Sequence, residues 1–280
     1  MSLQDTQKKA QKKWEDLTLA NAFVFSKVLL NEKLCKKIIQ ELLDIPPIED
    51  IRFLESEKIV DVDYETKSVR LDLYVQGIEN TVYNIEMQVR NTGELPQRSR
   101  QYQSIIDVDI LGKGEDYREL PDSYVIFICR VDIFKRGLYR YTFMNTCQEL
   151  PDLKLEDGTQ IVFLNTKGTI GDISEDTKAF LDYIEGQMSE KPFIRELEAE
   201  VMRVKSNREW RQQYMRAYLR DQVNWKLAKE EGKTEGEIEI KFKIVENGLK
   251  NNIPVETISI MTGLSIQEIE KLKEGMPNLK

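Results

Sequence analysis

The fold of this chain is decided by the stretch Val69-Arg70-Leu71-Asp72-Leu73-Tyr74-Val75 and the run Thr81-Val82-Tyr83-Asn84-Ile85-Glu86-Met87-Gln88-Val89 that follows it. In both runs apolar and polar residues alternate, which is typical of strands with one buried face. The intervening residues 76–80 are few enough for a hairpin. We therefore predict two neighbouring antiparallel strands with Asp72, Glu86 and Gln88 on their polar side.

The register of this hairpin sets the distance between Asp72 and Glu86. If Val75 pairs with Thr81, the two acids are diagonal neighbours with Cα atoms about 7–8 Å apart. At that distance they can share a hard cation such as Mg²⁺. The alternative is that both are surface acids and that Arg70 neutralises Glu86 across the strands. The spacing alone is compatible with either interpretation.

The composition predicts a globular chain with a sizeable core, since 40% of its 280 residues are hydrophobic. The net charge of −8 requires any nucleic-acid surface to be local. The N-terminus lacks an apolar leader segment, and the longest apolar run, residues 124–129, is too short for a bilayer, so we expect a cytoplasmic protein without membrane contact. The cysteines show no metal-ligand spacing and are predicted to be core thiols: Cys35, Cys129 and Cys147.

The chain contains no histidine, and this excludes histidine-based catalytic triads, histidine-metal nucleases and zinc proteases. Carboxylates, lysine, glutamine and tyrosine must carry any chemistry. Hydrolysis of a phosphodiester without histidine indicates a divalent metal that activates water and offsets charge. We predict that Asp72 and Glu86 hold Mg²⁺, or Mn²⁺ or Ca²⁺, and that Gln88 orients water through its amide.

Other periodic segments predict helices around a sheet. Residues 17–43 form an amphipathic pattern that ends before Pro46-Pro47, and Pro96 opens a second helix anchored by Ile106 and Val108. Buried strands are predicted at residues 124–129, 140–144 and 159–164. This order of elements indicates an α/β fold.

Five segments, taken in order, resemble the Rpn family of recombination-promoting nucleases and transposases, within the PD-(D/E)XK superfamily. They are Arg70-Leu-Asp72, Tyr83-Asn-Ile-Glu86-Met-Gln88, Leu95-Pro-Gln-Arg98-Ser-Arg100-Gln-Tyr102, Tyr124-Val-Ile-Phe-Ile-Cys129 and Phe163-Leu-Asn165. The resemblance covers about residues 15–185. It implies a restriction-endonuclease-like mixed sheet flanked by helices, with Asp72 and Glu86 as metal ligands and Gln88 where most of the superfamily has lysine. The implied activity is that of a Mg²⁺-dependent DNA endonuclease.

One position departs from this family pattern. The family has an acidic residue in its first helix where this chain has Ala22, within Asn21-Ala22-Phe23-Val24-Phe25. Glu55 or Glu57 is a candidate to replace that acid. The alternative hypothesis is a catalytically inactive relative that binds DNA or protein on the same scaffold.

Two basic segments are candidates for DNA contact. In the helix after Pro96, Arg98, Arg100 and Tyr102 either contact a phosphate or orient the site, whereas the alternative is an Arg98 ion pair with Tyr102 packed on the sheet. Residues 203–226 carry seven bases against two acids, with aromatic residues interleaved. Within it we predict DNA contacts by Arg208, Arg211 and Arg216. The alternative is a helix whose aromatic residues pack on the core.

The pattern divides the chain into a polar N-terminal segment (1–16), a nuclease-like domain (17–190), a basic aromatic helical segment (191–231) and a helical C-terminal extension (232–280). A hinge is predicted at the glycines of residues 230–236. Residues 254–272 resemble a helix-turn-helix, with a capping box from Ser265 to Glu268. Because its second helix is rich in glutamate, we expect it to contact protein, as in a homodimer, rather than DNA bases.

Overall fold

The computed structural model describes residues 10–60, 69–78 and 80–274. Its chain divides into two compact units, the first ending at Met215 and the second beginning at Arg216. None of the described helices is long and apolar enough to cross a membrane.

A mixed sheet forms the centre of the first unit. In the described residues it has six strands, in the order β1-β2-β3-β4-β6-β5. Strands β3, β4 and β6 are parallel, whereas β1–β2, β2–β3 and β5–β6 are antiparallel pairs. The strand bounds are Ile51–Val60 (β1), Val69–Gly77 (β2), Thr81–Gln88 (β3), Asp122–Cys129 (β4), Arg140–Phe143 (β5) and Thr159–Asn165 (β6).

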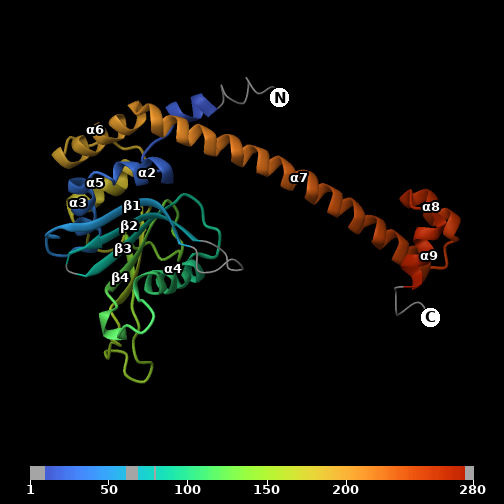
Figure 1. Cartoon of the computed structure of the whole chain (residues 1–280), viewed down its shortest axis with the longest axis horizontal. Helices are drawn as coiled ribbons and strands as arrows, with labels where there is room; N and C mark the ends of the chain where they lie inside the picture. The colour runs from blue at the N-terminus through green and yellow to red at the C-terminus, as the bar shows by residue number, and fades with distance from the viewer. Residues whose placement is uncertain (1–9, 61–68, 79, 275–280) are drawn as a thin grey trace. The chain divides into compact units, whose positions relative to one another are not determined.

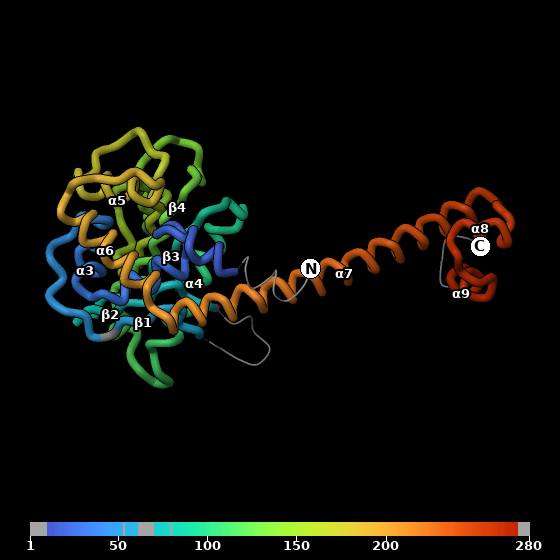
Figure 2. Tube along the Cα trace, turned by 90° about the horizontal axis from the view of Figure 1, so that it is seen from above, coloured from blue at the N-terminus to red at the C-terminus, as the bar shows by residue number. Residues whose placement is uncertain are grey.

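Helices cover both faces of this sheet, so the predicted fold class is confirmed (Figures 1 and 2). One face carries Ala22–Val28 (α2), Glu32–Leu43 (α3), Glu175–Ile184 (α5) and Pro192–Ser206 (α6), and the large apolar cluster lies beneath them. The opposite face carries Leu95–Ile110 (α4) over a second cluster that includes Tyr102 and Phe127. A short 3₁₀ helix, Tyr117–Glu119 (η1), leads into β4. The polar side predicted for β2 and β3 is therefore covered by protein.

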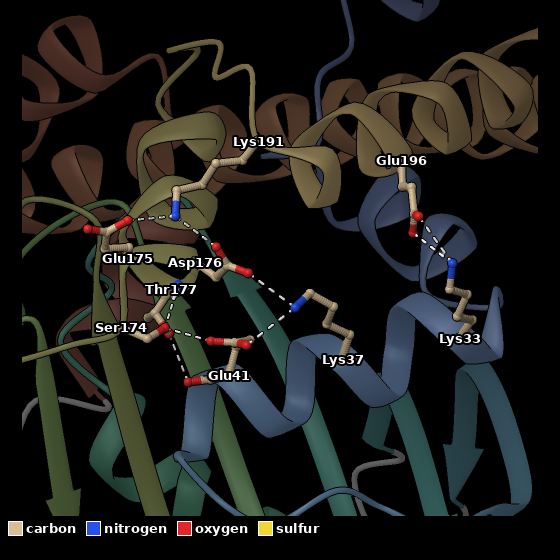
Figure 3. Close-up of polar contacts among 9 residues, drawn as sticks. All are labelled: Lys33, Lys37, Glu41, Ser174, Glu175, Asp176, Thr177, Lys191 and Glu196. Carbon is tan, nitrogen blue, oxygen red and sulfur yellow. Dashed lines mark hydrogen bonds and ion pairs between the residues drawn. The ribbon is translucent and has the colours of Figure 1, made fainter.

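Figure 3 shows the polar contacts that join α3, α5 and α6 on the first face. The Lys37 ammonium donates to Asp176 at 3.1 Å and to Glu41 at 3.4 Å. Lys191, the residue directly before α6, also donates to Asp176, at 2.9 Å, so this one carboxylate links α5 to α3 and to the start of α6. Lys191 and, to a smaller extent, Lys37 hold the pKa of Asp176 below its usual value, although burial acts to raise it.

Three local predictions are wrong. The helix predicted for residues 17–43 is two helices, because the side chain of Asn31 caps α3 by accepting from the Leu34 N–H at 3.3 Å. The strand at residues 140–144 is an edge strand rather than a buried one. Val108 is 60% exposed and does not anchor α4, whereas Ile106 is buried as predicted.

The second unit consists of helices. The long helix Arg208–Lys250 (α7) begins in the first unit, and its end packs with Val255–Thr262 (α8) and Ile266–Glu274 (α9). The hinge predicted at residues 230–236 is wrong, since α7 continues through both glycines. The capping box is confirmed: the Ser265 N–H donates to the Glu268 carboxylate at 2.8 Å, and the Glu268 N–H donates to the Ser265 hydroxyl.

Candidate active site

Asp72 and Glu86 face each other across β2 and β3. The observed pairs Leu73–Ile85 and Val75–Tyr83 place Asp72 directly opposite Glu86 when the register is continued. The predicted register, in which Val75 pairs with Thr81, is wrong by two residues. The reason is that β2 extends to Gly77 and β3 begins at Thr81, directly after Asn80, which lies in the left-handed region at φ 57°. The two acids are thus closer than the predicted diagonal arrangement.

Backbone hydrogen bonds fix both carboxylates between the strands. The Asp72 N–H donates to Glu86 Oε1 at 3.0 Å, and the Met87 N–H donates to Asp72 Oδ2 at 3.2 Å. Such bonds to charged acceptors orient a carboxylate strongly. They leave one oxygen of each acid, Asp72 Oδ1 and Glu86 Oε2, without a backbone bond from the described residues.

The interpretation of Glu86 as a surface acid paired with Arg70 is wrong. Glu86 is 1% exposed, because α4 covers it. Its cationic contact is Arg98, whose Nη2 lies 3.5 Å from Glu86 Oε2. Arg70 instead contacts Glu57, also at 3.5 Å.

Burial dominates the electrostatics of this pair. Desolvation raises the pKa of Asp72, although the Met87 N–H, Arg70 and Arg98 oppose it. Desolvation and then the charge of Asp72 raise the pKa of Glu86 well above its usual value, against the Asp72 N–H and Arg98. Two desolvated carboxylates that repel each other are stabilised in the charged state by a nearby cation.

Two of the three residues predicted on α4, Arg98 and Tyr102, lie at the acidic pair, whereas Arg100 does not. Arg98 Nη1 donates to the Gln88 side-chain oxygen at 3.3 Å, and Arg98 Nε donates to the Tyr102 hydroxyl at 3.2 Å. Tyr102 is buried and stacks on Phe127, with ring centres 6.0 Å apart. Burial and the charge of Glu86 raise the pKa of Tyr102 to about 12. Arg100 is exposed and has no recorded side-chain contact with this group among the described residues.

Glu57 lies on the other side of Asp72. The pairs Ser56–Leu73 and Lys58–Leu71 place Glu57 opposite Asp72 in the β1–β2 register. Its carboxylate is held by Lys27 of α2 at 3.2 Å, and Lys27 is only 6% exposed. Glu57 also has a left-handed backbone, with φ 59°. Sequence reasoning named Glu57 as a substitute acid but missed Lys27, because 29 or more residues separate Lys27 from its partners Ser56 and Glu57.

Asn84 is a second residue that sequence reasoning did not single out. It lies two positions before Glu86 on β3, is fully buried, and neither polar atom of its amide has a hydrogen-bond partner among the described residues. Its amide nevertheless acts to lower the pKa of Glu86, so it lies beside that carboxyl group. A fully buried amide of this kind marks the α4 side of Glu86 as a polar environment.

The donor chemistry of this site fits a hard divalent cation. Asp72 and Glu86 supply carboxylate oxygens, the ligands that Mg²⁺, Mn²⁺ and Ca²⁺ prefer. Within the described ranges no group of three or more acidic or cysteine side chains is arranged to hold a metal ion. Mg²⁺ is commonly bound by one or two carboxylates together with water and substrate phosphate, and two carboxylates match that pattern.

The predicted basic residues of α7 lie outside this group. Arg208, Arg211 and Arg216 are all exposed. The alternative, a helix packed by its aromatic residues, holds for the start of α7, where Tyr214 contacts Trp14 and Phe23 at ring-centre distances of 5.4 and 5.6 Å. It does not hold for Trp225, which is 59% exposed.

A family model described as PD-(D/E)XK nuclease family transposase matches residues 20–228. No curated protein and no solved structure matches the chain significantly. The matched range includes the sheet, the acidic pair, α4 and the first part of α7.

Proposed function

Because the chain belongs to the PD-(D/E)XK nuclease family transposases, we propose that it is a metal-dependent DNA endonuclease that hydrolyses phosphodiester bonds. The observation that carries this proposal is the directly opposed pair of the half-buried Asp72 and the buried Glu86, tied to the backbone of the two strands. Two like charges held together where they are partly shielded from water are costly for the fold. A bound cation would offset that cost, and the pair would then serve to hold the metal that hydrolysis requires.

We assign roles to the residues of this group as follows. Asp72 and Glu86 would hold Mg²⁺, or Mn²⁺ or Ca²⁺, and the ion would supply charge neutralisation and water activation. Gln88 fixes the guanidinium of Arg98 through its side-chain oxygen. Its amide nitrogen is then directed away from Arg98 and can donate to water or to phosphate.

DNA is the proposed substrate, and its binding must rely on local positive charge in a chain of net charge −8. Arg98 is partly exposed at the site, and Arg100 is exposed on the same helix. We also propose phosphate contacts for the exposed bases of α7, Arg208, Arg211 and Arg216. Their charge would steer and hold DNA without reading its sequence.

A catalytically inactive relative is the second candidate, and two observations favour it. Ala22 opens α2 without an acidic side chain in the first turn. Glu57, the nearest replacement on β1, is already paired with Lys27 and Arg70. Such a protein would retain the scaffold and DNA binding without turnover.

A nicking assay separates the two candidates. Supercoiled plasmid is incubated with the full chain in Mg²⁺, in Mn²⁺ and in EDTA, and DNA binding is measured in parallel in Ca²⁺. The endonuclease produces open circles in Mg²⁺ or Mn²⁺ but not in EDTA. Binding without cleavage in either metal would support the inactive relative instead.

We further propose that the second unit forms a homodimer. Apolar side chains line a hollow at the end of α7 and beside α9: Ile238, Phe242, Leu264 and Leu272. Exposed apolar surface of this kind typically marks a protein contact.

A further inference from the structure

The guanidinium of Arg98 is held by several groups beside the acidic pair. Gln88 accepts from Nη1, and the Tyr102 hydroxyl accepts from Nε and Nη2. The aromatic rings of Tyr102 and Phe127 lie 5.3 and 6.0 Å from its central carbon. Three independent groups therefore fix one position for a long side chain that would otherwise be mobile.

This position places positive charge next to the outward oxygen of the acidic pair. Arg98 Nη2 lies 3.5 Å from Glu86 Oε2, the oxygen that has no backbone bond. The side chain is 26% exposed, so it is neither fully buried nor free in solvent. Arginine has five N–H donors, and the contacts above leave at least one on Nη1 for a further acceptor.

The other cations near the pair are less suited to this role. Arg70 is 57% exposed and contacts Glu57 rather than either of the paired acids. Lys27 is buried and directed to Ser56 and Glu57. Within the described part of the chain, Arg98 is the basic side chain recorded in contact with Glu86 and Gln88.

Phosphodiester hydrolysis adds negative charge to the non-bridging oxygens in the transition state, and a preorganised cation stabilises that charge. We propose that Arg98 is a catalytic residue that contacts the scissile phosphate, and that Gln88 and Tyr102 are positioning residues that hold it there. This assignment rests on the proposed nuclease function. It gives Gln88 a role as an acceptor for arginine, which a cationic side chain at that position could not perform.

The test compares Arg98→Met, Arg98→Lys and the double variant Q88K/R98M with the wild-type chain. Arg98→Met should lower kcat for a duplex oligonucleotide in Mg²⁺ by at least about 100-fold, the typical effect of losing one preorganised charge donor. The kcat of Arg98→Lys should lie between that of the wild type and that of Arg98→Met. In Q88K/R98M an ammonium enters from the neighbouring position, and kcat should recover by at least about tenfold over Arg98→Met.

Two binding measurements distinguish a catalytic role of Arg98 from a role in which it only neutralises the charge of Glu86. Mn²⁺ affinity of the DNA-free protein, measured by calorimetry, should be unchanged or tighter in Arg98→Met, because a competing positive charge is lost. Affinity for inorganic phosphate in Ca²⁺ should fall at least about fivefold in the same variant. Arg118→Met is the matched control, since Arg118 is an exposed arginine of η1 that pairs with Asp116, and it should change none of these values.

Tyr102→Phe tests positioning separately. It removes the hydroxyl that accepts from Arg98 but keeps the packing ring, so kcat should fall by about tenfold with little change in KM. Wild-type kcat in Arg98→Met would overturn the assignment and leave the nuclease function intact. If the wild-type chain cuts in no metal, the nuclease function fails, and unchanged phosphate affinity in Arg98→Met then overturns the Arg98 contact as well.

Discussion

Asp72 and Glu86 are hydrogen-bonded to each other's strands: the Asp72 N–H donates to Glu86 Oε1, and the Met87 N–H next to Glu86 donates to Asp72 Oδ2. The carboxylates thus replace backbone-to-backbone bonds at this point of the β2–β3 pair. Their positions are set by the backbone rather than by flexible side-chain torsions. This arrangement allows their charge to be removed with little change in shape.

Asp72→Asn and Glu86→Gln should each lower cleavage by at least about 100-fold while the fold persists. Each amide keeps an oxygen that can accept the backbone N–H but loses the charge that holds a hard cation. Plasmid nicking, Mn²⁺ calorimetry and thermal unfolding in EDTA measure the three effects. Asp116→Asn, which changes an exposed acid that precedes η1, is the control. Wild-type cutting by either site variant would show that the pair is not the metal site.

Glu57→Gln should destabilise the first unit. Lys27 is 6% exposed, and its charge would then face an amide in place of the carboxylate, beside the Ser56 hydroxyl at 2.8 Å and the Phe23 ring at 5.2 Å. We expect the free energy of unfolding to fall by about 1–3 kcal/mol, as for a buried charge that loses its partner. Urea denaturation measures it, with Glu55→Gln on the same strand as the control. An equal loss in both variants would contradict the specific role of the Lys27 pair.

The strands around the acidic pair could be predicted because alternation is a local property of the sequence. The register could not, since it depends on where the turn at Asn80 begins. The prediction nevertheless placed Asp72 and Glu86 on one face, because an error of two residues preserves the face and only an odd shift reverses it. The burial of Glu86 was missed, since alternation does not show that α4 covers the polar side.

Glu185 provides a prediction about pH. It accepts from Arg130 Nε and Nη2 at 2.9 and 3.0 Å, from the Thr166 hydroxyl and from Lys167. The Arg130 bonds, with Lys167 and Thr166, lower the pKa of Glu185 to about 2, although burial opposes them. A lowered carboxyl pKa stabilises the fold above the unfolded value of 4.5, and this contribution is lost as pH falls towards 2.

Glu185→Gln should therefore lower the free energy of unfolding by about 2 kcal/mol at pH 7, a figure discounted because Arg130 and Lys167 are partly exposed. The difference from wild type should shrink between pH 5 and pH 2. Urea titrations at pH 7, 4 and 2.5 measure it. Glu190→Gln, in an exposed ion pair with Arg195, serves as the control. If the difference in unfolding free energy between wild type and Glu185→Gln stays constant with pH, the ionised Glu185 carboxylate is not the source of the stabilisation.

The contacts of the site show where sequence reasoning stops. Arg98 and Tyr102 were identified by their shared helical face and by family resemblance. The pairing of Lys27 with Glu57 and the hydrogen bond from Arg98 to Gln88 join different elements, so no local pattern encodes them. The helix break at Asn31 was predictable in principle, because asparagine before a helical run is a common N-cap.

The proposed homodimer predicts a loss of self-association when the apolar hollow of the second unit becomes polar. Ile238→Ser with Phe242→Ser changes two of its lining residues. Analytical ultracentrifugation should show a dimer for wild type and a monomer for this double variant. Ile260→Ser is the control, because Ile260 is 84% exposed and does not line the hollow. A wild-type monomer across the micromolar range would eliminate the dimer.

The last prediction concerns the exposed bases at the start of α7. Changing Arg208, Arg211 and Arg216 together to Gln should weaken duplex binding in Ca²⁺ and flatten its dependence on salt. Each phosphate contact releases close to one counterion, so the log–log slope should decrease in magnitude by up to about 3.

The matched control for this variant removes the same charge from another part of the same helix. Lys233, Lys243 and Lys250 each form an i,i+4 ion pair with a glutamate of α7. Their combined change to Gln alters the net charge equally but removes cations from a different part of α7. If the arginines contact phosphate, only their variant lowers the slope. Equal changes in both variants would mean that net charge alone sets the affinity, and an unchanged slope in the arginine variant would assign the start of α7 to packing, through the contacts of Tyr214 with Trp14 and Phe23.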